Sequence, residues 1–164
     1  MTRIGLLSDT HGWWDDKYVK YFSTCDEIWH SGDLGSDALA RDLAAIKPLR
    51  AVYGNIDGYP LRQQFPKIAH FTVEKVNVMM THIGGYPGRY EPSIRNELYE
   101  TKPQLFVCGH SHILKVMFDK HLNCLHINPG AAGMSGFQTE RTLVRFTIEE
   151  FAIKDMEVIE LGKR

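Results

Sequence analysis

The sequence predicts an α/β fold in which two packed β-sheets carry helices on their outer faces. In the first half of the 164-residue chain, short apolar runs alternate with amphipathic stretches, as in parallel strands joined by helices. From residue 113 onward β-rich runs dominate, so we expect the second half to be mostly antiparallel. Two packed sheets with helices outside accommodate both halves. The chain contains no repeat and no linker, and we expect one domain over residues 1–164.

The first half contains three predicted strands and two predicted helices. Residues 3–8 form a short apolar run, as in a strand that is buried on both faces. Residues 15–23 can form a helix with Tyr18, Val19 and Phe22 on one side. The other predicted elements are a strand over 27–31, a helix over 37–46 with Ser36 as its cap, and a strand over 49–54.

The second half is richer in predicted β-structure. Residues 69–82 hold two β-rich runs with a break near Lys75, which predicts a hairpin. Residues 91–102 are expected to form a helix, because a proline stands near its start, and residues 104–109 a strand. The remaining predicted strands cover 113–118, 124–128, 142–148 and 151–161.

Composition and charge exclude several classes of function. The formal net charge is −1, with 43% hydrophobic and 24% charged residues, so we expect no general nucleic-acid binding. No apolar segment is long enough to span a membrane, and the N-terminus lacks a signal peptide's features, so we expect a cytoplasmic protein. Cys25, Cys108 and Cys124 have no C-x-x-C spacing, which argues against a disulfide framework or a structural zinc site. A homo-oligomer remains open.

Five of the apolar runs are each followed by side chains that can bind a metal ion. These side chains are Asp9, His11, Asp33, Asn55, His82, His110 and His112. Functional sites in α/β sheets form at the carboxyl ends of the strands, so we expect the seven to cluster. A single Asp or Asn after a strand is usually a turn residue, but seven such residues at equivalent positions are difficult to explain by coincidence.

The chemistry of this set favours two divalent metal ions. Mixed imidazole and carboxylate ligation suits manganese, iron, zinc or nickel better than calcium or magnesium. Seven ligands are too many for one tetrahedral ion but suit two ions that share a carboxylate. Two metal ions about 3.5–4 Å apart can clamp an in-line displacement at phosphorus.

At these residues the chain resembles the calcineurin-like metallophosphoesterase superfamily. The matching segments are SDTHG for the family's D-x-H, GDLG for G-D-x-x, GNID for G-N-x-[DE], TH at 81–82 and GHSH for G-H-x-H. INPGA at 127–131 and the short length resemble the small prokaryotic phosphodiesterase branch. The resemblance covers residues 2–148 and implies a single domain with the family's four-layer sandwich, in which two mixed sheets lie between helices.

The resemblance also implies a role for each candidate ligand. Asp33 would bridge two divalent ions, with manganese the first candidate and iron, zinc or nickel the alternatives. The first ion would be held by Asp9, His11 and His112, and the second by Asn55, His82 and His110. A hydroxide between the ions would attack the phosphorus of a small phosphodiester substrate, with Asp33, Asn55 and His82 as the catalytic residues.

One position departs from many members of the family. Many relatives carry a histidine directly after the motif asparagine, where it can protonate the leaving oxygen, but this chain has Ile56. The small phosphodiesterase branch commonly lacks that histidine as well. We therefore expect a preference for leaving groups that need little protonation, since a general acid is typically worth about 10²–10⁴-fold in rate.

Other residues are weaker candidates. Residues 82–92 are glycine-rich and could cover the site and supply Arg89 or Tyr90, or form an ordinary surface loop. His30 is expected to support the ligands or to be a hydrogen-bonded core histidine. His70, His121 and His126 are not expected to bind metal, and Trp13 and Trp14 line the cleft or pack beside it.

Three alternatives to a phosphodiesterase stay open. A phosphomonoesterase would use the same metal ions, and the motifs do not separate the two activities. The superfamily also includes the small subunit of retromer, which uses this fold to bind proteins, but all seven ligand positions are intact here and favour an enzyme. Metal storage fits poorly, since an open bridging position suits hydrolysis better than retention.

Overall fold

The computed structural model describes all 164 residues, and its first sheet has the strand order β12-β11-β1-β2-β3. Three neighbouring strands of this sheet are parallel and come from the first third of the chain: β1 (Thr2–Leu7), β2 (Glu27–His30) and β3 (Leu49–Ala51). The C-terminal strands β11 (Glu140–Glu149) and β12 (Ala152–Lys163) extend the sheet in antiparallel fashion.

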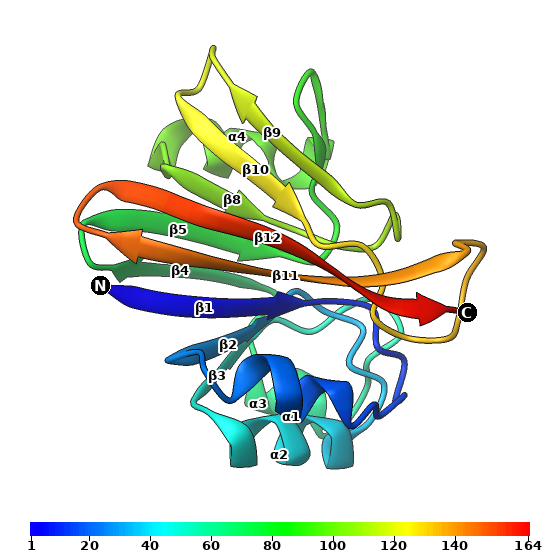
Figure 1. Cartoon of the computed structure of the whole chain (residues 1–164). Coiled ribbons are helices and arrows are strands. Elements are labelled where there is room, and N and C mark those ends of the chain that lie inside the picture. The colour runs from blue at the N-terminus through cyan, green and yellow to red at the C-terminus, as the bar shows by residue number, and fades with distance from the viewer.

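The second sheet packs against the first and has the order β4-β5-β8-β10-β9 (Figure 1). Its strands are β4 (Ile68–Val73), β5 (Val76–Thr81), β8 (Leu105–Val107), β9 (Lys115–Asp119) and β10 (Cys124–Asn128). The edge strands β4 and β9 pair antiparallel with their neighbours, whereas β5, β8 and β10 are parallel. The expectation of a mostly antiparallel second half was therefore only partly right, because crossovers place β8 between two parallel partners.

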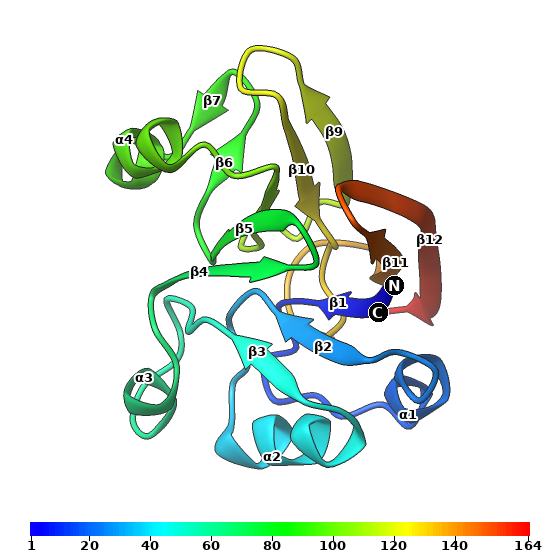
Figure 2. The same ribbon diagram turned by 90° about the vertical axis from the view of Figure 1, so that its left-hand side faces the viewer.

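Helices cover the outer face of each sheet (Figure 2). They are α1 (Lys17–Phe22), α2 (Asp37–Ile46), α3 (Leu61–Gln64) and α4 (Pro92–Thr101). Side chains from α1 and α2 pack on the first sheet, and α4 packs on the second. The backbone N–H of Leu39 donates to Ser36 Oγ at 3.1 Å, which is the predicted cap of α2. None of the helices is long and apolar enough to cross a bilayer.

The apolar core lies in three layers. One cluster fills the space between α1, α2 and the first sheet, and another lies between α4 and the second sheet. The third cluster joins the inner faces of the two sheets, with Leu6, Val107 and Phe146 among its buried members. The predicted four-layer sandwich of two mixed sheets between helices is confirmed.

Some local expectations differ from the structure. Val19 is 46% exposed, while Tyr18 and Phe22 on the same helix are buried, because α1 is too short for a wide apolar face. The sequence did not predict α3 or the small hairpin of β6 (Gly85–Tyr86) and β7 (Arg89–Tyr90). These elements have only four and two residues each, too few for a recognisable period.

Candidate metal centre

The loops after β1, β2, β3, β5 and β8 meet at one edge of the sandwich, and they bring all seven predicted ligands together. Two groups of three ligand atoms form there, and the atoms of each group lie within 4.8 Å of one another. The first group is Asp9, His11 and His112, and the second is Asp33, His82 and His110. Asn55 joins the second group, since its Oδ1 lies 3.1 Å from Nδ1 of His110.

Asp33 lies between the two groups. Its Oδ2 is 3.1 Å from Nε2 of His82 in the second group and 3.4 Å from Nε2 of His11 in the first. The carboxylate therefore faces one imidazole from each group, which is the position that a shared ligand requires. Its other oxygen, Oδ1, accepts the backbone N–H of Ile56 at 3.0 Å, and this fixes the orientation of the carboxylate.

Hydrogen bonds from surrounding groups orient the other ligands. Ser8 Oγ donates to Asp9 Oδ2 at 2.6 Å, so Oδ1 is left facing the cluster. His82 Nδ1 lies 2.8 Å from the carbonyl of Ser31, which requires a proton on Nδ1 and frees Nε2 as a ligand atom. His112 Nδ1 is 2.9 Å from Oε1 of Gln138. The sequence pattern did not reveal these three supporting residues.

Three buried atoms of the candidate ligands make no hydrogen bond in the protein, although carboxylate and imidazole atoms of the other candidates lie close to them. They are Asp9 Oδ1, His11 Nε2 and His82 Nε2. A buried polar atom without a hydrogen bond destabilises the folded state by about 1–3 kcal/mol. Three such atoms at one place therefore indicate a binding site for another group. All three can act as lone-pair donors, and a divalent cation satisfies such atoms. The donor set thus fits the predicted metal ions.

Without a bound cation, the carboxylates of the cluster are compensated by its own imidazole side chains. Burial by itself would raise the pKa of Asp9, but the nearby imidazoles of His11 and His112 outweigh burial and hold its pKa below the usual range. The carboxylates of Asp33 and Asp9 raise the pKa of His11 to about 9. Both carboxylates therefore stay ionised, and a bound cation would take the place of imidazolium protons.

Several candidate ligands have an unusual backbone conformation. The φ angles of Asp9, His11, Asp33, His110 and His112 are 54°, 46°, 58°, 71° and 63°. Residues other than glycine adopt this left-handed region at a cost of about 1 kcal/mol or more each. Such residues concentrate at functional sites, where surrounding structure holds them, and five at one centre point to function rather than to chance.

The sequence model of the calcineurin-like phosphoesterase superfamily domain matches residues 2–150. The chain belongs to this superfamily. A relative described as a probable metallophosphoesterase, from Methanothermobacter thermautotrophicus, is 27% identical over 135 residues, which are 78% of this chain and 76% of the relative.

Solved structures share the calcineurin-like fold. An archaeal phosphodiesterase has a TM-score of 0.74 at 20% identity, covering 97% of this chain and 99% of that one. Vps29 from Chaetomium thermophilum has a TM-score of 0.75 at 15% identity, with full coverage of both chains. At these identities the likeness concerns the fold.

A buried carboxylate in the superfamily's GNID segment joins two of the ligand loops. Asp57 accepts backbone N–H groups from Leu34, Gly35 and Gly54 at 3.1, 2.9 and 2.9 Å. The first two donors follow Asp33, and the third precedes Asn55. Asp57 therefore holds the loops after β2 and β3 in register without itself belonging to the cluster.

Two of the weaker candidates have structural roles. His30 is fully buried, its Nε2 lies 2.9 Å from Thr10 Oγ1, and burial lowers its pKa to about 4, so it is a neutral support of the ligand loops. Tyr90 is buried, and its hydroxyl donates to Asp119 Oδ2 at 2.5 Å. The expectation that Tyr90 could reach a substrate is therefore wrong, because the β6–β7 hairpin turns this ring into the protein.

The remaining candidates lie outside both ligand groups. His70 pairs with Glu97, His126 is buried in the second sheet, and His121 follows β9. Trp14 packs edge-to-face on Tyr18 in the core of the first sheet, while Trp13 is 44% exposed.

Proposed function

We propose that this calcineurin-like protein is a dinuclear metal-dependent phosphodiesterase of the cytoplasm, with manganese as its metal. Asp33 would bridge the ions. The first ion would be held by Asp9, His11 and His112, and the second by Asn55, His82 and His110. The observation that carries the proposal is the position of Asp33, whose Oδ2 faces an imidazole of each group.

The surrounding residues prepare the centre for hydrolysis at phosphorus. Two divalent ions at such a site supply a nucleophile from water near neutral pH and offset the charge of the phosphate. The Ser31 carbonyl keeps His82 in the tautomer that presents Nε2 to the centre. Asn55 is exposed, so its amide is accessible to a phosphate oxygen. Ile56 is 48% exposed and cannot transfer a proton, which favours substrates with a stable leaving group.

Preference for a diester over a monoester is supported by the archaeal phosphodiesterase that shares the fold. The likeness to Vps29 favours a scaffold as the second candidate. The seven intact candidate positions, three of which have buried atoms that make no hydrogen bond, favour hydrolysis, since binding a protein partner does not require them.

The test compares metal-dependent hydrolysis of a diester and a monoester. The purified protein is stripped of metal, reloaded with Mn²⁺, and assayed on bis-p-nitrophenyl phosphate and on p-nitrophenyl phosphate. We expect faster turnover of the diester and two ions per chain by elemental analysis. Asp33→Asn should lose more than the 10–100-fold that supporting residues typically contribute.

Asp42→Asn provides the matched control, because Asp42 is an exposed carboxylate on α2. Its turnover should equal that of the unmodified protein. Faster turnover of the monoester would favour the phosphomonoesterase, and two bound ions without turnover of either compound would favour the scaffold.

A further inference from the structure

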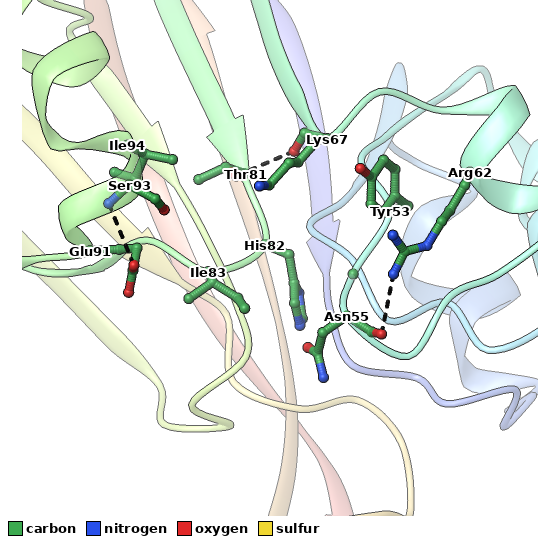
Figure 3. A pocket seen from close by; sticks show the side chains of 11 residues that line it. Tyr53, Asn55, Arg62, Lys67, Thr81, His82, Ile83, Glu91, Ser93 and Ile94 are labelled. Carbon is green, nitrogen blue, oxygen red and sulfur yellow. Dashed lines mark hydrogen bonds between the residues drawn. The ribbon is translucent and has the colours of Figure 1, made fainter.

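A cavity of about 300 Å³ opens directly beside the second group of candidate ligands. Asn55 and His82 line it, so any molecule bound at the centre could extend into it. Figure 3 shows Arg62 and Lys67 on one side of the cavity and Glu91 on the other. We call this cavity, with Arg62 and Lys67, the cationic pocket.

Arg62 is held in place by neutral acceptors. Its Nε donates to the backbone carbonyl of Asp57, its Nη2 donates to that of Asn55 at 3.3 Å, and its guanidinium lies 4.5 Å from the ring centre of Tyr53. No carboxylate pairs with this guanidinium, and Nη1 has no protein partner. The charge of Arg62 is thus oriented beside Asn55 and is not neutralised.

Lys67 supplies a second uncompensated charge. It lies between α3 and β4, and its side chain extends into the pocket (Figure 3). Its backbone carbonyl accepts the hydroxyl of Thr81 at 3.2 Å, which anchors the residue to β5. Its ammonium group forms no ion pair, unlike the ammonium groups of Lys75 and Lys154, which pair with Glu150 and Glu149.

Glu91 is the one carboxylate that lines the pocket. It stands on the wall opposite Lys67 and is near the backbone N–H of Ser93, at 3.5 Å. Two cations and one anion leave the pocket with a net positive charge, concentrated on the Arg62 side. Such a site attracts an anionic group, and an arginine and a lysine together suit carboxylate or phosphate oxygens.

We propose that the cationic pocket binds a second anionic group, a carboxylate or a phosphate, which is carried by one of the two ester substituents (arms) of the phosphodiester substrate. The inference rests on the proposed function for the position of the scissile phosphate. It narrows the substrate class to phosphodiesters with a charged arm and separates them from diesters with two neutral arms.

Calorimetric titration of the Mn²⁺-loaded protein tests the proposal without any catalytic step. The probes are propylphosphonate, 2-carboxyethylphosphonate and ethane-1,2-diphosphonate, which place a methyl, a carboxylate or a second phosphonate at the far end. We expect the charged probes to bind about tenfold more tightly than propylphosphonate, the effect of one charge-assisted hydrogen bond. The better of the two charged probes identifies the anionic group.

Lys67→Met keeps the length of the side chain and removes its charge, and it should abolish most of that tenfold ratio. Lys120→Met is the matched control, because Lys120 is exposed in the turn that precedes β10, at the opposite end of the parallel strands. Comparison of variants cancels any interaction of the probes with Mn²⁺, since the metal ligands are unchanged.

Equal affinities of the three probes, an unchanged ratio in Lys67→Met, or an equal loss in Lys120→Met would each overturn the inference. Failure of the proposed function looks different. The protein would then bind Mn²⁺ and discriminate between the probes, yet it would hydrolyse no diester.

Discussion

Replacement of Gly54 by alanine tests whether the position of Asp33 controls activity. A Cβ atom at Gly54 would lie 2.0 Å from Oδ1 of Asp33 and 2.4 Å from its backbone nitrogen. Real Cβ contacts are essentially never shorter than 3.0 Å, so the carboxylate must move by at least 1.0 Å (3.0 − 2.0). The contact with Oδ1 displaces the carboxylate that lies between the two candidate ligand groups and that is held by the N–H of Ile56. The contact with the backbone nitrogen also pushes the loops after β2 and β3 apart.

The expected loss is large for activity and moderate for stability. A misplacement of about 1 Å at a reacting centre can cost about 10²-fold, so kcat on bis-p-nitrophenyl phosphate should fall at least that far. Overpacking typically costs about 1–3 kcal/mol, which corresponds to a decrease in Tm of about 2–12 °C for a domain of this size. Turnover, thermal melting followed by circular dichroism, and metal content are measured on the same sample.

Gly58→Ala is the control for Gly54→Ala. A Cβ atom at Gly58 meets nothing within 4 Å, and neither glycine has a left-handed φ, so the two alanines differ in their contact with Asp33 and not in backbone strain at the substituted residue. Gly58→Ala should keep the activity and Tm of the unmodified protein. If Gly54→Ala is folded, binds two ions and retains kcat within threefold, then the placement of Asp33 between the two groups does not control activity.

Four further predictions follow from single contacts. Removal of metal by a chelator should lower Tm by about 5–10 °C for each site that was filled to 100 times its Kd, because the ions bind the folded chain, and an unchanged Tm would argue against both sites. Asp57→Asn should lower Tm by about 3–12 °C, because it weakens charge-assisted hydrogen bonds from three backbone N–H groups. An unchanged melting curve would show that Asp57 does not stabilise the two loops. Tyr90→Phe should lower Tm by about 3–12 °C while KM for bis-p-nitrophenyl phosphate stays constant, and a raised KM would indicate that the β6–β7 hairpin takes part in substrate binding. Ile56→His should accelerate diesters with alkoxide leaving groups by up to about 10²-fold, and no acceleration would contradict the idea that a missing acid limits the leaving group.

The sequence predicted the candidate ligands more fully than the contacts that hold them. Each candidate ligand follows a buried apolar strand by a few residues, so a local pattern is sufficient to predict it. Gln138 supports His112 from 26 residues away and has no such pattern around it. The parallel partners of β8 were missed for the same reason, since periodicity shows that a strand is buried but not which strands lie beside it.

The glycines of the motifs explain why a local pattern can nevertheless mark a site built from distant loops. Gly109 precedes His110, yet a Cβ atom there would lie 2.2 Å from Oγ of Ser8 and 2.8 Å from Oδ2 of Asp9, in the loop after β1. Gly54 precedes Asn55, and its Cβ would strike Asp33, in the loop after β2. In both cases the glycine makes room for a carboxylate of another loop, because the loops must approach closely for their ligands to meet. A glycine stands directly before each of these two candidate ligands because two loops pack closely at that point. Replacement of either glycine by a larger residue should therefore displace the candidate ligand in the neighbouring loop more than the one that follows the glycine.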